Sequence, residues 1–312
     1  MKQLQKLFLS IMLIATVCLL VPSSANAQII KKYTWNGFVY TKDDVPWKDG
    51  DINILSYKGK KKNLIIPSEI KGLKVAYVHS LGKSKTLESV HISDDVEVIG
   101  GVLSKCPNLK KVTISKTNPD YMIKNKMLLS KDGKTLVGCP GAVKNPKIPD
   151  SVTVIGHSAF SGMNIKKITI GKNVTQIEHC AFKNCKKLSN VNFNKKLKII
   201  DGEAFYGCKA LKEIKLPDSV IQLSDYIFAE CTKLETLKIG KNLKYIGFGN
   251  LTACKSLRSL YIYSKNCLIE EGADTLLDSI PNQKNVTVYG KKGSTIQKEA
   301  EKYSQIKFQV IK

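Results

Sequence analysis

The sequence predicts a repetitive solenoid: a strand-rich α/β fold in which a parallel strand ladder and short helical turns stack along one axis, with a cap at each end. Two observations predict this fold class. Large apolar anchors recur every 22 or 23 residues, at Phe160, Phe182, Phe205, Phe228 and Leu251. A second apolar set returns in phase behind each anchor, so one unit cannot bury its apolar face alone, whereas stacked units can.

The sequence pattern of each unit predicts a strand, then one helical turn, then a second strand. At the end of the unit, apolar and polar residues alternate, as around Ile214 and Leu216. This period of two residues is typical of a half-buried strand. The Ala-Phe-x-x-Cys segment spaces apolar residues by i, i+3, which is typical of one helical turn. We count seven copies, two of them degenerate, and about three or more are needed to bury a shared core.

The N-terminus has the features of an export signal. Lys2 and Lys6 precede an apolar run that ends at Val21, and Ala25-Asn26-Ala27 follows, so residues 1–27 are predicted to be a signal peptide. The alternative is a retained N-terminal anchor, but the run is short for a membrane span. No second segment could span a membrane. We therefore expect an extracellular protein, secreted or associated with the cell surface.

The remaining chain divides into four predicted parts. Residues 28–74, rich in aromatic side chains, predict an N-terminal cap or half-repeat, and residues 75–262 hold the repeats. Residues 115–146 interrupt them with a predicted hairpin, in which Asp132-Gly133 suits a tight turn. Residues 263–312 predict a strand, a helix and a strand that form a C-terminal cap, because repeat arrays need their open ends covered.

The repeat has a specific consensus. Its pattern, Val-x-x-Ile-x-x-x-Ala-Phe-x-x-Cys-x-x-Leu-x-x-Ile-x-Leu/Ile-Pro/Gly, resembles the BspA-like leucine-rich repeat of bacterial surface and secreted proteins. The resemblance covers Val75 to Ile262, and the hairpin resembles an insertion common in that family. Met163 replaces the cysteine of one copy, and Asn250-Leu251 replaces Ala-Phe in another. The resemblance implies a leucine-rich-repeat solenoid and adhesion to host matrix proteins, host cells or other bacteria.

The chain is strongly basic, with 50 Lys and Arg residues and a formal net charge of +24. Such a charge attracts polyanions, including anionic wall polymers, acidic glycans and nucleic acid. However, the lysines are spread along the whole chain and Arg258 is the one arginine, which disfavours specific nucleic-acid recognition. Two interpretations stay open: a solvated lysine-rich surface, and diffuse adherence to anionic surfaces.

Five cysteines share one repeat position, in phase with the core. They are predicted to be buried free thiols acting as small hydrophobes, because neighbours in register point the same way and do not face each other as a disulfide requires. These are Cys106, Cys185, Cys208, Cys231 and Cys254. The state of the off-phase cysteines Cys139, Cys180 and Cys267 stays open.

Metal and catalytic sites are not predicted. His157 and His179 occupy equivalent positions and Cys180 follows, but the flanking copies offer no third ligand of that kind. The acidic cluster Asp43, Asp44, Asp49 and Asp51 fails the EF-hand pattern and predicts a solvated loop. The sequence has no nucleophile elbow, zinc-protease motif, phosphate loop or dinucleotide fingerprint. We expect no enzyme and no cofactor.

The polar residues of the second strand of each unit predict the binding surface, because they face outward in two rows. The first row is Ser89, Lys111, Lys167, Asn190, Glu213, Thr236 and Ser259; the second row is His91, Thr113, Thr169, Asn192, Lys215, Lys238 and Tyr261. Aromatic side chains beside cations suit protein or glycan contact. The predicted partner-binding residues are Lys215, Lys238, Tyr261 and Tyr263. The rival functions are a wall- or glycan-associated structural protein held by charge and, less favoured, a secreted enzyme.

Overall fold

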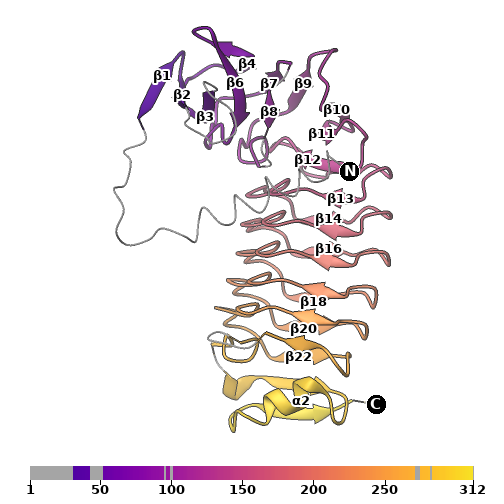
Figure 1. Ribbon diagram of the computed structural model, residues 1–312. Helices are drawn as coiled ribbons and strands as arrows, with labels where there is room; N and C mark the ends of the chain where they lie inside the picture. The colour runs from indigo at the N-terminus through magenta and orange to yellow at the C-terminus, as the bar shows by residue number, and fades with distance from the viewer. Residues whose placement is uncertain are drawn as a thin grey trace. The chain divides into compact units, whose positions relative to one another are not determined.

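Stacked turns built from short strands make up the computed structural model (Figure 1). The structure describes residues 31–42, 52–94, 96–98, 101–270, 275–281 and 283–311. Every described helix and strand lies in the unit Lys32–Lys312, a strand-rich solenoid of about 11 turns, which confirms the predicted solenoid; the two caps stay a prediction. The predicted signal peptide, residues 1–27, and the acidic cluster of residues 43–51 lie outside the described residues.

One side of the stack is a parallel ladder of two-residue strands. It runs in the order β13, β15, β17, β19, β21 and β23, and the paired residues of successive strands stay in register. The second residue of each strand is a buried Ile or Leu, as the repeat pattern predicts. The strands are β13 Val154–Ile155, β15 Gln176–Ile177, β17 Ile199–Ile200, β19 Gln222–Leu223, β21 Tyr245–Ile246 and β23 Leu268–Ile269.

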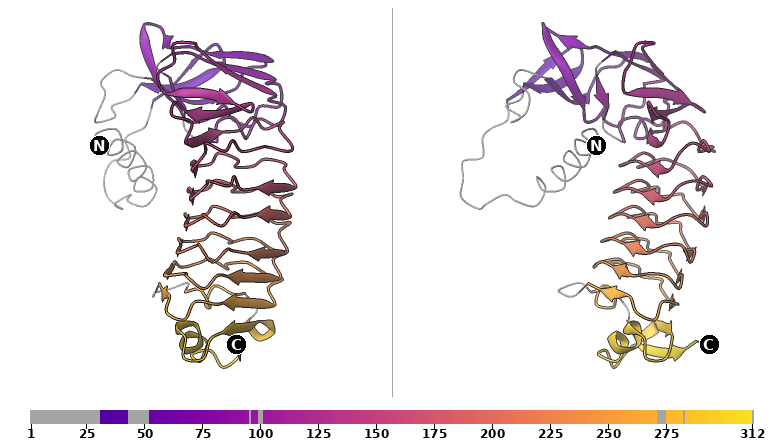
Figure 2. Two further views of the ribbon diagram at one scale, coloured as in Figure 1. Left: turned by 90° about the vertical axis from the view of Figure 1, so that its right-hand side faces the viewer. Right: turned by 45° about the vertical axis from the view of Figure 1, so that its right-hand side comes forward.

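A second side carries the longer strands, which we call the strand face. Its strands pair in parallel within three sheets (Figure 2). Along these strands, buried and outward residues alternate. The first sheet is β4 Asn63–Ile66, β7 Ser89–Ile92 and β9 Lys111–Ile114, and the second is β14 Lys167–Thr169 and β16 Asn190–Asn192. The third is β18 Glu213–Lys215, β20 Thr236–Ile239, β22 Ser259–Ile262, β24 Thr287–Gly290 and β25 Lys307–Val310.

Turns close the third side, which we call the turn side. The repeat position two residues before each anchor has a left-handed backbone in five consecutive turns, with φ between 53° and 64°, at Ser158, Cys180, Glu203, Tyr226 and Gly249. Such a backbone costs a non-glycine residue about 1–2 kcal/mol. Hydrogen bonds between turns offset that cost, as from the Cys180 N–H to the Gly202 carbonyl at 3.0 Å. The expected helical turns are present as turns hydrogen-bonded over three residues, because these left-handed residues prevent a continuous helix.

The core between the three sides is a column of phenylalanine rings. Phe160, Phe182, Phe205 and Phe228 are fully buried, and their ring centroids follow one another at 5.0, 5.1 and 5.8 Å. The in-phase cysteines are buried beside this column. The Sγ atom of Cys208 donates to the carbonyl of Phe182, in the preceding turn, at 3.2 Å, and three other cysteines repeat that contact.

The N-terminal strands enclose a separate core that reaches from Phe38 to Leu128. They are β1 Lys32–Trp35, β2 Phe38–Lys42, β3 Ile52–Tyr57, β5 Glu69–Ile70, β6 Leu73–Val78 and β8 Glu97–Val98. The predicted hairpin is present as three antiparallel strands, β10 Tyr121–Lys124, β11 Met127–Ser130 and β12 Thr135–Gly138. Because β12 also pairs in parallel with β13, the hairpin leads directly into the two-residue ladder.

The strand ladder continues beyond residue 262. After η1 (Gln283–Asn285), β24 pairs with β22 and β25 pairs with β24, all in parallel. Between them, α2 (Thr295–Ala300) begins at Ser294, whose side chain accepts a hydrogen bond from the Gln297 N–H, and it buries Ile296. That this segment caps the core stays a prediction. Among the described residues, no helix has the length and apolar character needed to cross a bilayer.

Candidate binding surface

The outward residues of the strand face form the two predicted rows. In the third sheet, Glu213 pairs with Thr236 and Thr236 with Ser259, while Lys215 pairs with Lys238 and Lys238 with Tyr261. The other two sheets keep the same register. The rows also extend past the predicted repeats, since Thr287 and Lys307 continue the first row and Tyr289 and Gln309 continue the second.

The structure brings three of the four predicted binding residues into contact. Lys238 Nζ lies 5.6 Å from the centroid of the Tyr261 ring, and the rings of Tyr261 and Tyr263 stack at 6.2 Å. Lys215 lies one strand further along the second row and its side chain is exposed. Lys238 and Tyr261 face outward, as predicted, and their side chains are half-buried.

A carboxylate holds Lys238 over the ring. Glu213, in the first row of β18, accepts a hydrogen bond from Lys238 Nζ at 2.8 Å. This bond raises the pKa of Lys238, so the ammonium stays charged. The ion pair is exposed, and exposed pairs contribute little to stability. Its effect is to orient the ammonium against the aromatic ring.

Sequence reasoning missed Tyr289, which completes the aromatic surface. Its ring stacks on Tyr261 with centroids 4.1 Å apart and an angle of 6° between the planes. Burial, followed by a hydrogen bond to Tyr289, raises the pKa of Tyr261. We call Tyr261, Tyr263 and Tyr289 the tyrosine cluster. The signal that could have found Tyr289 is its alternation with the apolar Val288 in the last predicted strand region.

The N-terminal half of the second row is polar rather than aromatic. His91 Nδ1 and Thr113 Oγ1 lie 3.0 Å apart, and Asn192 donates to Thr169 at 3.4 Å. These polar side chains lie within hydrogen-bonding distance of their neighbours along the row. Tyr261 and Tyr289, the aromatic side chains of the two rows, therefore lie at the C-terminal end of the strand face.

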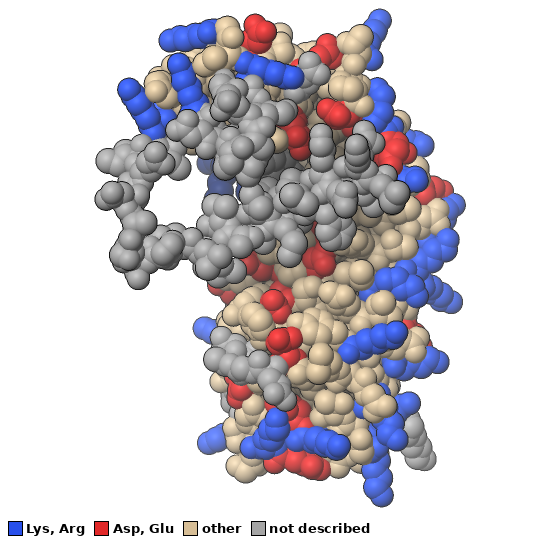
Figure 3. All heavy atoms as spheres, viewed as in Figure 1, with Lys and Arg blue, Asp and Glu red and all other residues tan. Residues whose placement is uncertain are grey.

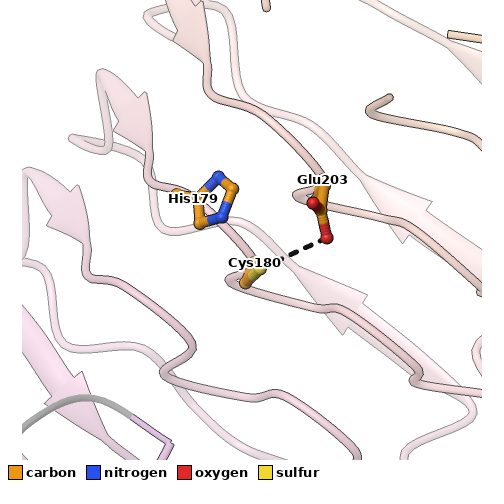
Figure 4. A group of neighbouring side chains, drawn as sticks. All are labelled: His179, Cys180 and Glu203. Atoms are coloured by element: carbon orange, nitrogen blue, oxygen red, sulfur yellow. Dashed lines mark hydrogen bonds between the residues drawn. The ribbon is translucent and has the colours of Figure 1, made fainter. Parts of the chain in front are cut away.

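A second group of side chains lies on the turn side (Figure 4). The rings of His157 and His179 stack at 5.5 Å, as their equivalent repeat positions predict. Their neighbours include Glu203, which sequence reasoning did not consider as a ligand: one ligand atom each of His179, Cys180 and Glu203 lie within 4.8 Å of one another. Burial raises the pKa of the Cys180 thiol to about 12. The signal for Glu203 was present, because it occupies the repeat position of Cys180 in the next copy.

The chain is similar to known proteins in both sequence and fold. The model of the BspA type leucine rich repeat region matches residues 138–258 and 175–300, with six copies. No curated protein matches the chain. Among solved structures, the pneumococcal vaccine antigen PcpA has a TM-score of 0.52 at 16% identity, covering 92% of this chain and 100% of that one. A leucine-rich repeat protein from Eubacterium ventriosum also has 0.52 at 16% identity, covering 80% and 92%.

Proposed function

The chain belongs to the BspA-type leucine-rich repeat family, and from this premise we propose that it is an exported bacterial interaction protein. It binds an extracellular protein or glycan of host matrix, host cells or other bacteria through the strand face. Two features support export to the cell surface. One is the predicted signal peptide, and the other is the resemblance to a family of bacterial surface and secreted proteins. The absence of any catalytic motif in the sequence supports binding rather than catalysis.

The tyrosine cluster beside Lys238 is the observation that carries this proposal. Three stacked rings present flat apolar area with little conformational entropy to lose on binding, and phenol groups add hydrogen-bonding capacity. The ammonium of Lys238, fixed by Glu213, places a cation beside the rings. Trp, Tyr and Arg supply most of the binding energy of many interfaces, whereas Ser and Thr contribute little. We therefore place the main partner contact on β20, β22 and β24.

A capture experiment tests the proposal. The purified chain is immobilised, and host matrix, host cell and bacterial wall fractions are passed over it. We expect the triple variant Lys215→Ala, Lys238→Ala and Tyr261→Ala to fold, because all three side chains point outward, and to capture the partner at least about tenfold more weakly.

The matched control removes two lysines from the hairpin instead. Lys124 and Lys126 are exposed at the turn between β10 and β11, so Lys124→Ala with Lys126→Asn changes the net charge equally and leaves the core intact. Tyr121 is unsuitable for this purpose because it is buried. If the hairpin variant loses the partner while the triple variant retains it, the strand face is not the binding surface.

Attachment to anionic wall polymers is a second candidate function, favoured by the distribution of lysines. Loops that follow the second strands of several turns carry exposed lysines, at Lys172, Lys195, Lys196, Lys241 and Lys265. In the face shown in Figure 3, lysines project along one edge of the stack while acidic side chains gather nearer its middle. Binding through such diffuse charge weakens as salt shortens the Debye length, to about 10 Å at 0.1 M. Capture that disappears with added salt, in parent and triple variant alike, would favour this candidate.

A further inference from the structure

We propose that His179, Cys180 and Glu203 form a binding site for a divalent transition-metal ion, with zinc as the preferred ion. The three side chains lie on the turn side, away from the two outward rows of the strand face (Figure 4). Imidazole nitrogen, thiolate sulfur and carboxylate oxygen are the three ligand types that zinc takes in proteins. The proposal is independent of the partner proposed above.

The spacing of the ligand atoms suits tetrahedral coordination. Cys180 Sγ and Glu203 Oε2 lie 3.7 Å apart, and all three ligand atoms lie within 4.8 Å of one another. Bond lengths of about 2.0 Å to oxygen and nitrogen and 2.3 Å to sulfur place tetrahedral ligands about 3.5 Å apart. A side-chain rotation of His179, which is exposed, closes the remaining gap. Water takes the fourth position.

The backbone holds two of the ligands at adjacent levels of the solenoid. Cys180 and Glu203 share one repeat position and have nearly the same left-handed φ, 59° and 56°. The N–H of Cys180 donates to the Gly202 carbonyl at 3.0 Å, and the N–H of Glu203 donates to the Asp225 carbonyl at 2.9 Å. Because these hydrogen bonds fix both backbones to the next turn, the Cα–Cβ bonds of the two ligands are positioned at adjacent levels before any ion binds.

Gly202 leaves room beside the third ligand. A Cβ atom at this position would lie 3.2 Å from His179 Nδ1. The equivalent position of the neighbouring copies carries His157, His179 or Asp225, so glycine here is specific to the turn that contains Glu203. On its other side, the imidazole stacks on His157, whose pKa burial lowers to about 4. The His179 ring thus contacts His157 on one face, and the absence of a side chain at Gly202 leaves room for the ring to rotate toward the other two ligands.

A lysine competes with the proposed ion. Lys183 pairs with Glu203 and lies 4.8 Å from the centroid of the Tyr206 ring. A bound metal ion displaces this ammonium, and the thiol releases its proton to solvent because the thiolate is the ligand. The sulfur and nitrogen ligands favour zinc, cobalt or nickel over calcium and magnesium, which prefer oxygen alone. The ion then links two successive turns.

Metal titration of the purified, reduced chain tests the site. Zinc affinity is measured by competition with a chromophoric chelator, and Co²⁺ is added separately because a thiolate ligand gives it a sulfur-to-cobalt absorption band. We expect one bound ion per chain and a higher melting temperature with zinc. His179→Ala, Cys180→Ser and Glu203→Gln should each lower the affinity by at least about tenfold, since even outer-shell changes cost about 10–100-fold.

Two further variants make the result decisive. Lys183→Gln removes the competing ammonium and should raise the affinity several-fold, which a variant that merely damages the fold would not do. His91→Ala, on the strand face, is the matched histidine control and should leave the affinity unchanged. The proposal is overturned if the parent binds no zinc, or if Cys180→Ser keeps both the zinc affinity and the cobalt absorption band, which would assign the ion to other thiols.

Discussion

Phe205 lies in the middle of the aromatic column and contacts the rings of the turns on either side. Its centroid is 5.1 Å from Phe182 and 5.8 Å from Phe228, and Phe193 meets its edge at 5.9 Å. The side chain is fully buried. Each anchor therefore fills its own turn and also packs against the next, which is how a repeat that cannot fold alone gains its stability.

Replacing Phe205 with alanine tests this packing. The substitution removes a buried ring and leaves a cavity that a ladder of fixed turns cannot close, so we expect a loss of about 3–5 kcal/mol in the free energy of unfolding. Urea denaturation measures it. Leu268→Ala is the control, because Leu268 is 63% exposed and should cost less than about 0.5 kcal/mol. A loss below about 1 kcal/mol for Phe205→Ala would contradict the role of the column.

At the scale of the element, sequence periodicity predicted most of the ladders. The anchors, the in-phase cysteines and both outward rows lie where the repeat pattern placed them, because a constant repeat length fixes the register of parallel strands. The pattern failed at Tyr289 for a physical reason. Thr236 and Ser259 pair although they are 23 residues apart in the sequence, whereas Ser259 and Thr287 are 28 residues apart. The longer loop between β22 and β24 therefore moves Tyr289 out of the 23-residue repeat.

The group of His179, Cys180 and Glu203 could be predicted only in part. The equivalence of Cys180 and Glu203 is visible in the repeat alignment. Their convergence depends on the left-handed backbone and on the hydrogen bonds between turns. Neither residue is glycine or asparagine, the types that signal such a backbone, so nothing local in the sequence indicates it.

The cysteine column makes a prediction at the same scale. Cys185, Cys208, Cys231 and Cys254 are buried, and each thiol donates to a phenylalanine carbonyl of the preceding turn. Burial raises the pKa of Cys185 and Cys254 to about 12, so the unreactive thiol form prevails in the fold. We expect these four thiols to react with an alkylating reagent far more slowly in native protein than in denaturant without reductant. Disulfide-linked peptides joining neighbouring turns, found by mass spectrometry, would contradict this.

At the scale of the whole unit, apolar burial and charge act on different surfaces. The apolar residues form two separate buried clusters, one from Phe38 to Leu128 and one from Met127 to Ile306. The lysines lie outside them and give the chain its net charge of +24, which favours solubility and attraction to polyanions. Substitutions in the buried clusters can therefore change the stability of the fold without changing the surface charge, and substitutions of surface lysines can change partner choice without changing the core.

The two separate cores predict that damage to the fold stays local. In a solenoid each turn is coupled mainly to its neighbours, so a cavity at Phe205 should weaken the turns that contain Phe182 and Phe228 more than distant ones. Amide hydrogen exchange of Phe205→Ala, read by mass spectrometry, should show faster exchange between about residues 176 and 246. The strands β2 and β3 contribute to the other core, so their exchange should match the parent. Uniformly faster exchange, including these two strands, would mean that the unit unfolds in a single cooperative step and that the cores are not independent.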